Sequence, residues 1–381
     1  MINKMNYSPR LPNILKELKM DTYKTFFLID VGASAGIDSC WNSFGDKLEA
    51  IGFDPLISEV ERLNRQNNNP RVRYEEAFIV YKDFDKNYPE DLRKKDSVNY
   101  NSFESTSSVR ATQSQNYNYI QQHFNDGKPV VYSKRCIQLD DFVKQNNIID
   151  VDFIKVDTDG HDLPVLLGGA KTLDDANVLG VQVEAQFHGS PHHYANTFSN
   201  IDQFLRSKGF TLFNLDNYYY SRGVLPSKFL YRIFAQTVTG QIQWGEALYF
   251  RDLADKQYSQ KFNFRVTIDK VMKLACLYEI YGLNDCAAEL LINRAEELNF
   301  TQHLKVLLNS LTPPFRGKKI EYSEYMKRFD KNPEKWFTLE EDERDSNIAK
   351  IIVSKMRFII NPIYLAYKIL KKITYAFRVR R

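Results

Sequence analysis

The chain has 381 residues, of which 43% are hydrophobic and 14% aromatic, a composition typical of a globular protein with a hydrophobic core. Its net charge of +4 comes from its end: residues 350–381 hold nine of the 52 basic residues and no acidic one, which leaves 43 basic against 48 acidic residues elsewhere. This distribution argues against a nucleic-acid-binding body, and no apolar run reaches the roughly 20 residues needed to span a membrane.

The cysteines and the first residues of the chain indicate a cytoplasmic protein. The four cysteines are widely spaced and form no Cys-x-x-Cys pair, which favours reduced thiols over a disulfide framework or a zinc site: Cys40, Cys136, Cys276 and Cys286. Residues 1–20 lack the uninterrupted apolar core of a secretion signal. Residues 1–24 are expected to form an N-terminal helical cap.

Strand-like and helical segments alternate up to about residue 255. The expected strands are Thr25–Val31, Leu48–Asp54, Val72–Phe78, Asp152–Asp157, Leu179–Phe187, Phe210–Leu215 and Glu246–Phe250. Several are continuous apolar runs, as in strands buried on both faces of a parallel sheet. Helices are expected between them, for example over Ser58–Asn67 and over Phe198–Lys208, the latter ended by Gly209. The pattern predicts an α/β fold with a doubly wound, Rossmann-like sheet.

One segment interrupts this alternation. Residues 99–125 are rich in Ser, Asn, Gln and Tyr and include the run 105–108, Ser-Thr-Ser-Ser. An insertion of this length in a compact domain is either a functional lid or a solvated loop.

The first strand leads directly into a glycine-containing turn, Asp30-Val31-Gly32-Ala33-Ser34-Ala35-Gly36. Glycine allows positive φ and a close approach of the backbone to a ligand, and a following helix would offer its free N–H groups. The second strand ends at Asp54, 18 residues after Gly36, where a carboxylate can accept the hydroxyls of a ribose. The spacing differs from the Gly-x-Gly-x-x-Gly of dinucleotide sites, and Asp30 suits an amino acid's ammonium group. S-adenosylmethionine is therefore favoured over NAD or FAD.

The most distinctive segment is Ile154-Lys155-Val156-Asp157-Thr158-Asp159-Gly160-His161-Asp162, a buried strand that runs into acidic residues. It is preceded by Leu139-Asp140-Asp141 and followed by Val165-Leu166-Leu167-Gly168-Gly169-Ala170. Together with the glycine turn and two later segments, 179–184 and 244–249, this order of motifs resembles the FkbM family of S-adenosylmethionine-dependent methyltransferases. The resemblance spans roughly residues 25–253. It departs at His161, where the family usually has Glu.

The resemblance implies a class I methyltransferase domain over residues 25–255 that binds S-adenosylmethionine. The candidate cofactor-binding residues are Asp30, Gly32, Ala33, Ser34, Gly36, Asp54, Pro55 and Ala77. It also implies O-methylation of a hydroxyl, most often on a sugar or on a polyketide-like natural product.

Transfer of a methyl group to an alcohol requires alignment of the reactants and removal of the hydroxyl proton by a general base or with a metal. The catalytic candidates are Asp157, His161, Glu184 and His188, which lie at the expected carboxyl ends of the fourth and fifth strands. Each has a simpler explanation: Asp157 could cap the following helix, and His161 could be solvated. Glu184 lies within an apolar strand, where an unpaired carboxylate is costly and needs a partner, a metal or a substrate hydroxyl.

Two further patterns leave alternatives open. The histidines at 188, 192 and 193 follow the fifth strand, so Asp157, Glu184 and His188 could hold a divalent metal ion, or this segment could be a substrate-gating loop. Tyr218-Tyr219-Tyr220 could stack on sugar rings or form a surface turn.

After residue 255 the sequence predicts an all-helical appendage: a helical hairpin over 256–310, a linker over 311–349 and a basic amphipathic tail over 350–381. Asn361 and Pro362 are typical of a helix start, and apolar and basic residues then fall on opposite faces. Such a tail could lie on an anionic membrane surface or pack on its own protein.

These patterns favour an O-methyltransferase acting on a sugar hydroxyl of a polysaccharide or glycolipid, in the bacterial cytoplasm and peripherally at the inner face of the membrane through residues 361–381. A methyltransferase of small natural products is the first alternative. A non-catalytic binding module on the same fold and an oxidoreductase are the others.

Overall fold

The computed structural model describes residues 5–91, 106–112, 131–231, 234–315 and 317–336. Residues 1–311 form one compact unit and residues 312–381 a second, and we describe each by itself. The sequence-based boundaries at residues 24 and 255 therefore both lie within the first unit.

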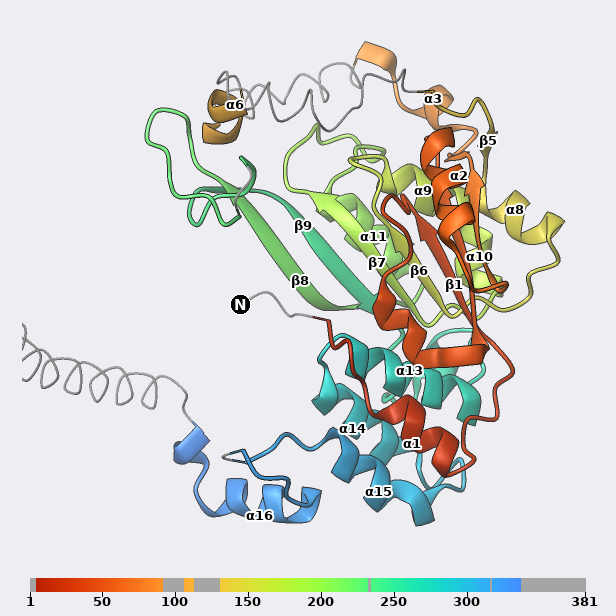
Figure 1. The fold of residues 1–381 in the computed structure, drawn as a ribbon, viewed down its shortest axis with the longest axis vertical. Coiled ribbons are helices and arrows are strands. Elements are labelled where there is room, and N and C mark those ends of the chain that lie inside the picture. The colour runs from red at the N-terminus through yellow and green to blue at the C-terminus, as the bar shows by residue number, and fades with distance from the viewer. Residues whose placement is uncertain (1–4, 92–105, 113–130, 232–233, 316, 337–381) are drawn as a thin grey trace, which may run out of the picture. The chain divides into compact units, whose positions relative to one another are not determined.

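The first unit is organised around a seven-stranded sheet (Figure 1). Its strands are β1 (Phe26–Val31), β2 (Leu48–Asp54), β3 (Val72–Glu76), β6 (Phe153–Val156), β7 (Gly180–Gln186), β8 (Thr211–Tyr220) and β9 (Gln241–Phe250). The order across the sheet is β3-β2-β1-β6-β7-β9-β8, and β9 runs in the direction opposite to the other six strands. This is the sheet of class I methyltransferases, and it confirms the doubly wound α/β prediction. The strand order reverses between β1 and β6, where sheets of this kind bind ligands.

The predicted strands agree with the observed ones in the parallel half of the sheet and are too short at its antiparallel edge. There, β8 and β9 form a hairpin that extends well past the predicted ends at Leu215 and Glu246. The run Tyr218–Tyr220 is the end of β8 rather than a surface turn, and two register shifts interrupt the ladder, near Leu212 and Tyr218. Asn and Asp residues, which are rare in strands, obscure this part of β8 in the sequence.

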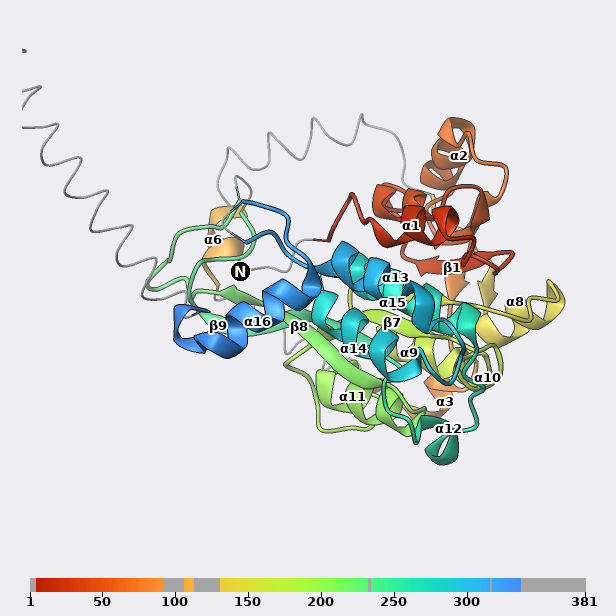
Figure 2. The ribbon, with the colours of Figure 1, turned by 90° about the horizontal axis from the view of Figure 1, so that it is seen from below.

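Helices cover both faces of the sheet (Figure 2). On β1, Phe26 and Leu28 point into one hydrophobic core, and Phe27 and Ile29 point into another, as the period of two requires. The first core includes residues of α1 (Leu11–Glu17), η1 (Ser39–Lys47), α13 (Ile268–Ile280), α14 (Asn284–Arg294) and α15 (Thr301–Leu311). The second includes residues of α8 (Leu139–Gln145), α9 (Asp162–Gly168), α10 (Ala170–Asp175) and α11 (Phe198–Ser207).

The helical region predicted after residue 255 is part of the core of this unit. It consists of α12 (Tyr258–Lys261), α13, α14 and α15, so the range predicted as a two-helix hairpin, 256–310, also contains nearly all of a third long helix. Thr267 caps α13 by accepting a hydrogen bond from the Lys270 backbone N–H, and Asp269 adds a negative charge to the first turn. Eleven of the 13 residues of α13 are buried, because the helix packs on the sheet as well as on α14.

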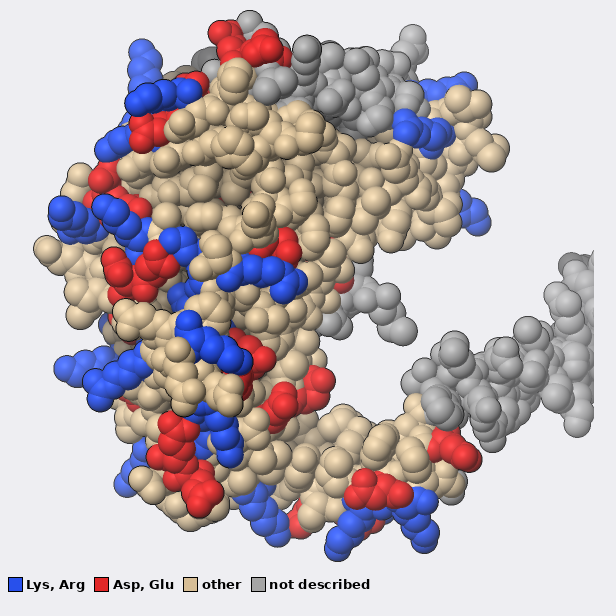
Figure 3. Space-filling view, turned by 180° about the vertical axis from the view of Figure 1, so that it is seen from behind, with Lys and Arg blue, Asp and Glu red and all other residues tan. Residues whose placement is uncertain are grey.

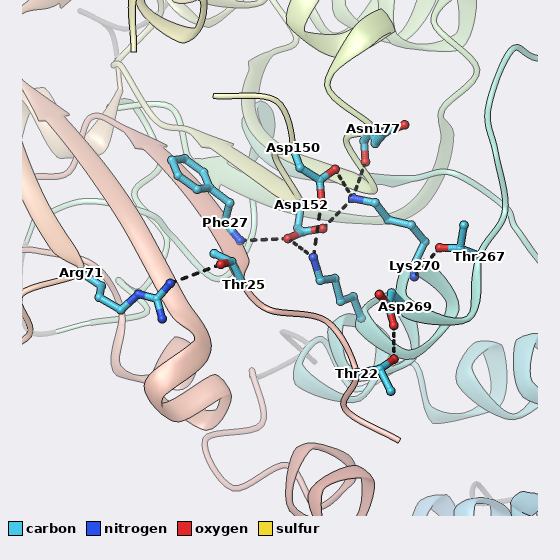
Figure 4. Close-up of polar contacts among 11 residues, drawn as sticks. Thr22, Thr25, Phe27, Arg71, Asp150, Asp152, Asn177, Thr267, Asp269 and Lys270 are labelled. Carbon is cyan, nitrogen blue, oxygen red and sulfur yellow. Dashed lines mark hydrogen bonds and ion pairs between the residues drawn. The ribbon is translucent and has the colours of Figure 1, made fainter. Parts of the chain in front are cut away.

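A buried charged cluster fixes α13 to the start of β6 (Figure 4). The carboxylate of Asp152 is fully buried and accepts hydrogen bonds from Lys270 Nζ at 2.8 Å, Lys273 Nζ at 2.7 Å and the Phe27 backbone N–H at 2.9 Å. Lys270 Nζ also lies 2.7 Å from Asp150. Buried charges of this kind are tolerated only when they are paired and hydrogen-bonded.

The segment after the glycine turn differs from the expected helix. It is the 3₁₀ helix η1, which begins at Ser39 after Asp38 caps it through the Cys40 N–H. Gly45, with φ of 58°, interrupts it, and Phe44 stacks on Phe26 of β1 at 3.7 Å between ring centroids. The connection from β2 to β3 is α2 (Ile57–Gln66), one residue from its predicted position.

Part of the insertion between residues 99 and 125 is ordered against the β8–β9 hairpin. Helix α6 (Ser107–Thr112) lies beside the loop that joins these strands, and Ser107 donates its backbone N–H to the Ser221 carbonyl at 2.8 Å. The Ser108 hydroxyl donates to the Ala235 carbonyl at 2.5 Å, and Thr106, Ser107 and Ser108 are buried. These residues are therefore not a solvated loop. The flanking α3 (Phe84–Asn87), β4 (Phe78–Ile79) and β5 (Cys136–Ile137) complete this region.

The second unit contains α16 (Tyr322–Lys331) and η2 (Pro333–Trp336), which lie within the residues predicted to be a linker. Trp336 packs against Phe315, Tyr325 and Phe329, and Arg328 pairs with Glu324 one helical turn away. The predicted tail 350–381 lies outside the described residues. Among the residues that the structure describes, no helix is long and apolar enough to span a membrane. Acidic and basic side chains are interspersed on the face that Figure 3 shows.

Candidate active site

The predicted cofactor-binding residues lie at the carboxyl ends of three adjacent parallel strands, β1, β2 and β3. Asp30 is the last residue but one of β1, and the backbone N–H groups of Gly32 and Ala33 both donate to the Phe53 carbonyl of β2 at 2.9 Å. Asp54 ends β2, and Ala77 follows β3, with its N–H 3.3 Å from the Asp54 carbonyl. Ala33 is buried and Ser34 is exposed. The structure therefore brings the predicted residues to one edge of the sheet.

The turn after β1 has a backbone that only small residues allow. Gly32 has φ of 88° and Gly36 φ of 93°, and Ala35 between them is also in the left-handed region at 67°. A Cβ atom on Gly32 would lie 1.8 Å from the Asp157 carbonyl oxygen, so this glycine is required by the close approach of the segment after β6. The turn therefore contacts both β2 and the segment that follows β6.

Asp30 and Asp54 are buried carboxylates at this edge. Asp30 is 3% exposed, and its Oδ1 atom has no hydrogen-bond partner among the described residues, since Lys155 Nζ is 3.6 Å away. Burial raises the pKa of Asp30 to about 6. Asp54 accepts a hydrogen bond from the Leu56 N–H at 2.7 Å. An unpartnered buried carboxylate oxygen is costly, so Asp30 is suited to a positively charged or hydrogen-bond-donating ligand.

Asp157 follows β6 and faces the same edge. Its side chain is 48% exposed, and its Oδ2 atom lies 3.1 Å from Lys155 Nζ, which also faces Asp30. Lys155 is therefore the cation between the two carboxylates. In the turn that follows, Asp159 and Gly160 have positive φ, and Asp162 closes the turn by accepting the Thr158 N–H at 3.2 Å. Burial raises the pKa of Asp162 to about 7.

Glu184 lies on β7 next to this turn, half-buried, with Glu246 directly opposite on β9. Burial, together with the negative charges of Asp162, Asp157 and Asp159, raises the pKa of Glu184 to about 8. Burial also raises the pKa of Glu246, and the negative charge of Asp157 adds to this effect. A carboxylate whose pKa lies near neutrality can take up a proton during a reaction, and such groups gather at functional sites.

Comparison with known families identifies this arrangement. Residues 30–212, just under half of the chain, match the methyltransferase FkbM domain. The chain contains an S-adenosylmethionine-dependent methyltransferase domain of the FkbM family. The match begins at Asp30 and includes Asp54, Asp157 and Glu184. It confirms the resemblance seen in the sequence. A comparison with curated proteins gives no match.

Several solved structures of methyltransferases resemble the chain at low similarity. One is a TehB-like S-adenosylmethionine-dependent methyltransferase from Corynebacterium glutamicum, with 10% identity, a TM-score of 0.26 and coverage of 63% of this chain and 86% of that one. Another is the precorrin-6y C5,15-methyltransferase from Geobacter metallireducens, with 10% identity, a TM-score of 0.29 and coverage of 62% and 86%. Magnesium protoporphyrin IX methyltransferase from Synechocystis, with bound S-adenosylmethionine, has 9% identity, a TM-score of 0.26 and coverage of 62% and 75%.

The residues of the methyltransferase domain fit the cofactor. S-adenosylmethionine carries an ammonium group, a sulfonium and a ribose, and the buried carboxylates of Asp30 and Asp54 match its cations and its hydroxyls. The orphaned Oδ1 atom of Asp30 supplies the acceptor that an ammonium group needs. The glycine turn, with its Gly32 and Gly36 conformations, leaves room for close approach of the ligand to the backbone.

Sequence reasoning did not find a second row of polar residues at this edge. Gln182 on β7 donates to Glu246 Oε2 at 2.9 Å and accepts from the Tyr281 hydroxyl at 2.8 Å. Lys155 lies beside Gln182 in the β6–β7 register. The sequence does contain one indication of this row. Lys155 and Asp157 alternate along a buried strand, and a buried lysine needs a carboxylate partner. Tyr281, which follows α13, lies outside the matched domain and gave no such signal.

The predicted histidines lie in a different setting. His161 is exposed, precedes α9 and contacts the edge of the Phe84 ring at 5.4 Å between centroids. His188 lines a surface hollow of about 390 Å³ with the start of α11. His192 stacks on Tyr88 at 4.7 Å and on His193 at 4.4 Å. The loops after β4, β6 and β7 are thus joined by aromatic packing.

The predicted metal ligands are not assembled as a metal site. Among the described residues, no three His, Cys, Asp or Glu side chains are grouped so that they could hold a metal ion. Asp157, Glu184 and His188, the predicted ligands, therefore do not form a metal site in this structure. Asp157 pairs with Lys155, and His188 lines the hollow beside α11.

Proposed function

We propose that this protein transfers the methyl group of S-adenosylmethionine to a hydroxyl of a sugar in a polysaccharide or glycolipid, with Glu184 as the general base. The observation that carries the proposal is the half-buried Glu184 carboxylate, with its pKa raised to about 8, at the mouth of the cofactor edge. Its raised proton affinity makes Glu184 better suited than an ordinary carboxylate to accept a proton from an alcohol nucleophile.

The proposed chemistry assigns a role to each residue of the site. S-adenosylmethionine, when bound, supplies a methyl group that is already activated by its positive sulfur. Glu184 accepts the hydroxyl proton while the acceptor oxygen bonds to the methyl carbon and the carbon–sulfur bond breaks, and Glu184 then returns the proton to solvent. Asp157, held by Lys155, orients the acceptor hydroxyl, and Asp30 holds the ammonium group. Alignment of the reactants supplies up to roughly 7–11 kcal/mol in favourable systems.

The sugar acceptor is tested by mass spectrometry of cell-surface glycans from cells with and without the gene. Loss of a 14-dalton increment on a sugar residue in the deletion strain, restored by the wild-type gene and not by a Gly32→Ala variant, would support the proposal. Gly32→Ala places a Cβ atom on the Asp157 backbone and is expected to abolish cofactor binding. An unchanged glycan profile would rule out the sugar acceptor and would favour a small natural product instead.

We also propose that the protein meets a lipid-linked acceptor at an anionic membrane surface through residues 361–381. The proposal is based on the sequence alone, in which basic and apolar residues alternate at helical spacing after Pro362. Sedimentation with vesicles of phosphatidylglycerol and phosphatidylcholine tests it. The full chain should bind the anionic vesicles and lose that binding at high salt, while a chain ending at residue 349 should not bind. Equal binding of the two proteins would contradict it.

A further inference from the structure

One face of the β8–β9 edge carries polar and aromatic side chains that the cofactor does not need. In the antiparallel register, Glu184 of β7, Glu246 of β9 and Asp216 of β8 lie side by side, and the next row consists of Gln186, Trp244 and Tyr218. Directly opposed residues on neighbouring antiparallel strands point to the same face of a sheet. These six residues, which we term the acceptor strip, therefore extend from Glu184 along the β8–β9 hairpin.

The acceptor strip is on the more open face of the hairpin. Along β9, Gln243, Gly245 and Ala247 are buried, whereas Trp244 and Glu246 between them are half-buried. Asp216 and Gln186 are half-buried as well. The helices of the first core, which lie on this face, pack against Leu248 and Phe250 at the other end of β9. The strip thus begins where the hydrophobic core ends.

The aromatic part of the strip is held in a fixed orientation. The rings of Trp244 and Tyr218 stack with centroids 4.0 Å apart and planes 18° apart, and Tyr218 is buried beneath its neighbours. The indole N–H of Trp244 is 3.4 Å from the Tyr220 hydroxyl oxygen. Because both ring stacking and a polar contact restrain it, Trp244 is a pre-oriented flat surface rather than a mobile side chain.

The polar part of the strip is rich in hydrogen-bond acceptors. Glu246 accepts from Gln182 at 2.9 Å, and Asp216 accepts from Asn214 at 3.1 Å. A carboxylate offers about four acceptor positions, so each retains capacity for donors from a ligand. A ligand on this surface should combine an apolar ring face with several hydroxyl donors and should carry no negative charge, because a negative charge would lie beside the carboxylates of Glu246 and Asp216.

We propose that the acceptor strip binds a neutral sugar ring, which stacks on Trp244 while its hydroxyls donate to Glu246 and Asp216, and presents one hydroxyl to Glu184. This inference rests on the proposed function and narrows it to a neutral rather than an acidic sugar. An apolar polyketide would leave the carboxylates without donors, and a uronic acid or a phosphorylated sugar would place like charges together.

The experiment measures methyl incorporation from radiolabelled S-adenosylmethionine into matched neutral and acidic glycosides with the full chain. The probes are methyl glycosides and oligosaccharides of neutral hexoses and the corresponding hexuronic acids. The expected result is methylation of a neutral probe with kcat/KM at least tenfold above that of its uronic acid counterpart at low salt. If the uronic acid is methylated as efficiently as the neutral probe or more so, the inference of a neutral sugar is wrong, while the proposed function of sugar methylation still holds.

Two variants test whether the acceptor strip contributes to binding of the acceptor rather than to the methyl-transfer step. Trp244→Leu and Glu246→Gln are expected to raise KM for the neutral probe at least tenfold while kcat changes less than threefold, with calorimetric binding of S-adenosylmethionine unchanged. Tyr219→Leu is the control, because Tyr219 is an aromatic residue on the neighbouring strand β8 of the same hairpin, is 37% exposed and is not part of the strip. If the KM for the neutral probe is the same in Trp244→Leu and Glu246→Gln as in Tyr219→Leu, the strip is not the acceptor site. If no sugar probe is methylated while the cofactor binds, the proposed function itself fails.

Discussion

Two charged clusters lie at opposite ends of strand β6, and they differ in their balance of charge. At the start of the strand, Asp152 and Asp150 face Lys270 and Lys273, two carboxylates for two ammonium groups. At the other end, Lys155 is the cation that contacts Asp30 and Asp157, while Glu184 and Glu246 lie on the next strands. The second cluster therefore holds more negative than positive charge.

The difference separates a structural site from a functional one. In the balanced cluster, the buried Asp152 carboxylate is satisfied by three hydrogen-bond donors. In the cluster with excess carboxylates, burial and mutual repulsion raise the pKa values of Asp30, Asp162 and Glu184 to about 6, 7 and 8. Such an arrangement costs stability and is retained where a cationic ligand or a proton transfer uses it.

The largest effect is expected from Glu184→Gln. The variant removes the proposed base without changing the size of the side chain, so kcat should fall by about 10²–10⁴-fold while S-adenosylmethionine still binds. Stopped assays of methyl incorporation with the neutral acceptor, together with calorimetry of cofactor binding, measure the two quantities. Loss of less than threefold in kcat would assign the base to another residue, and His161→Gln is the variant to compare.

The next largest effect is expected at the balanced cluster. Asp152→Ala leaves the buried Lys270 and Lys273 with only the partly exposed Asp150 as a carboxylate partner, which should lower the free energy of unfolding by about 3–5 kcal/mol. Asp150→Asn is the matched control, since Asp150 is 39% exposed and its removal should cost only about 0–1 kcal/mol. Urea denaturation with and without the cofactor checks both values. A stability loss of similar size in the two variants would show that Asp152 does not anchor α13.

The sequence predicted the half of the site that is built from consecutive residues. The glycine turn, Asp54 and the segment around Asp157 could be placed because each follows a continuous apolar run, and the ends of parallel strands meet at one edge. Tyr281 and the acceptor strip depend on contacts between distant parts of the chain. Trp244 and Tyr218 face each other only through the β8–β9 register, which two irregularities shift and which no local pattern encodes.

Contacts between distant residues also determine the structure of the chain after residue 255. The residues of α13 suggested an ordinary amphipathic helix, but its lysines are partners of Asp152, more than 100 residues earlier in the chain, so the helix belongs to the sheet. Residues 311–349 looked irregular because their charges and prolines are conspicuous. The packing of Trp336 with Phe315, Tyr325 and Phe329 nevertheless gives residues 315–336 a small aromatic cluster.

A moderate effect is expected in the pH dependence of stability. Asp30, Asp162 and Glu184 have raised pKa values, so the folded protein keeps protons that the unfolded chain has lost above about pH 4–5. Each extra proton lowers the free energy of unfolding by about 1.4 kcal/mol for every pH unit of increase, so stability should fall as the pH rises to about 8. Urea denaturation from pH 5 to 9 measures this slope. Glu184→Gln should flatten it between pH 7 and 8, and Asp150→Asn should leave it unchanged.

The smallest effect is a linked release of protons when the cofactor binds. The sulfonium and ammonium groups of S-adenosylmethionine should lower the pKa values of the carboxylates around Asp30 and Glu184, so a fraction of a proton leaves the site at pH 7. Calorimetry in buffers of different ionisation enthalpy measures that fraction. S-adenosylhomocysteine, whose sulfur is uncharged, should release fewer protons, and Glu184→Gln should reduce the release further. Equal proton release for the two ligands would mean that the sulfonium does not sense the cluster with excess carboxylates, and Glu184 would then lie too far from the methyl group to act as its base.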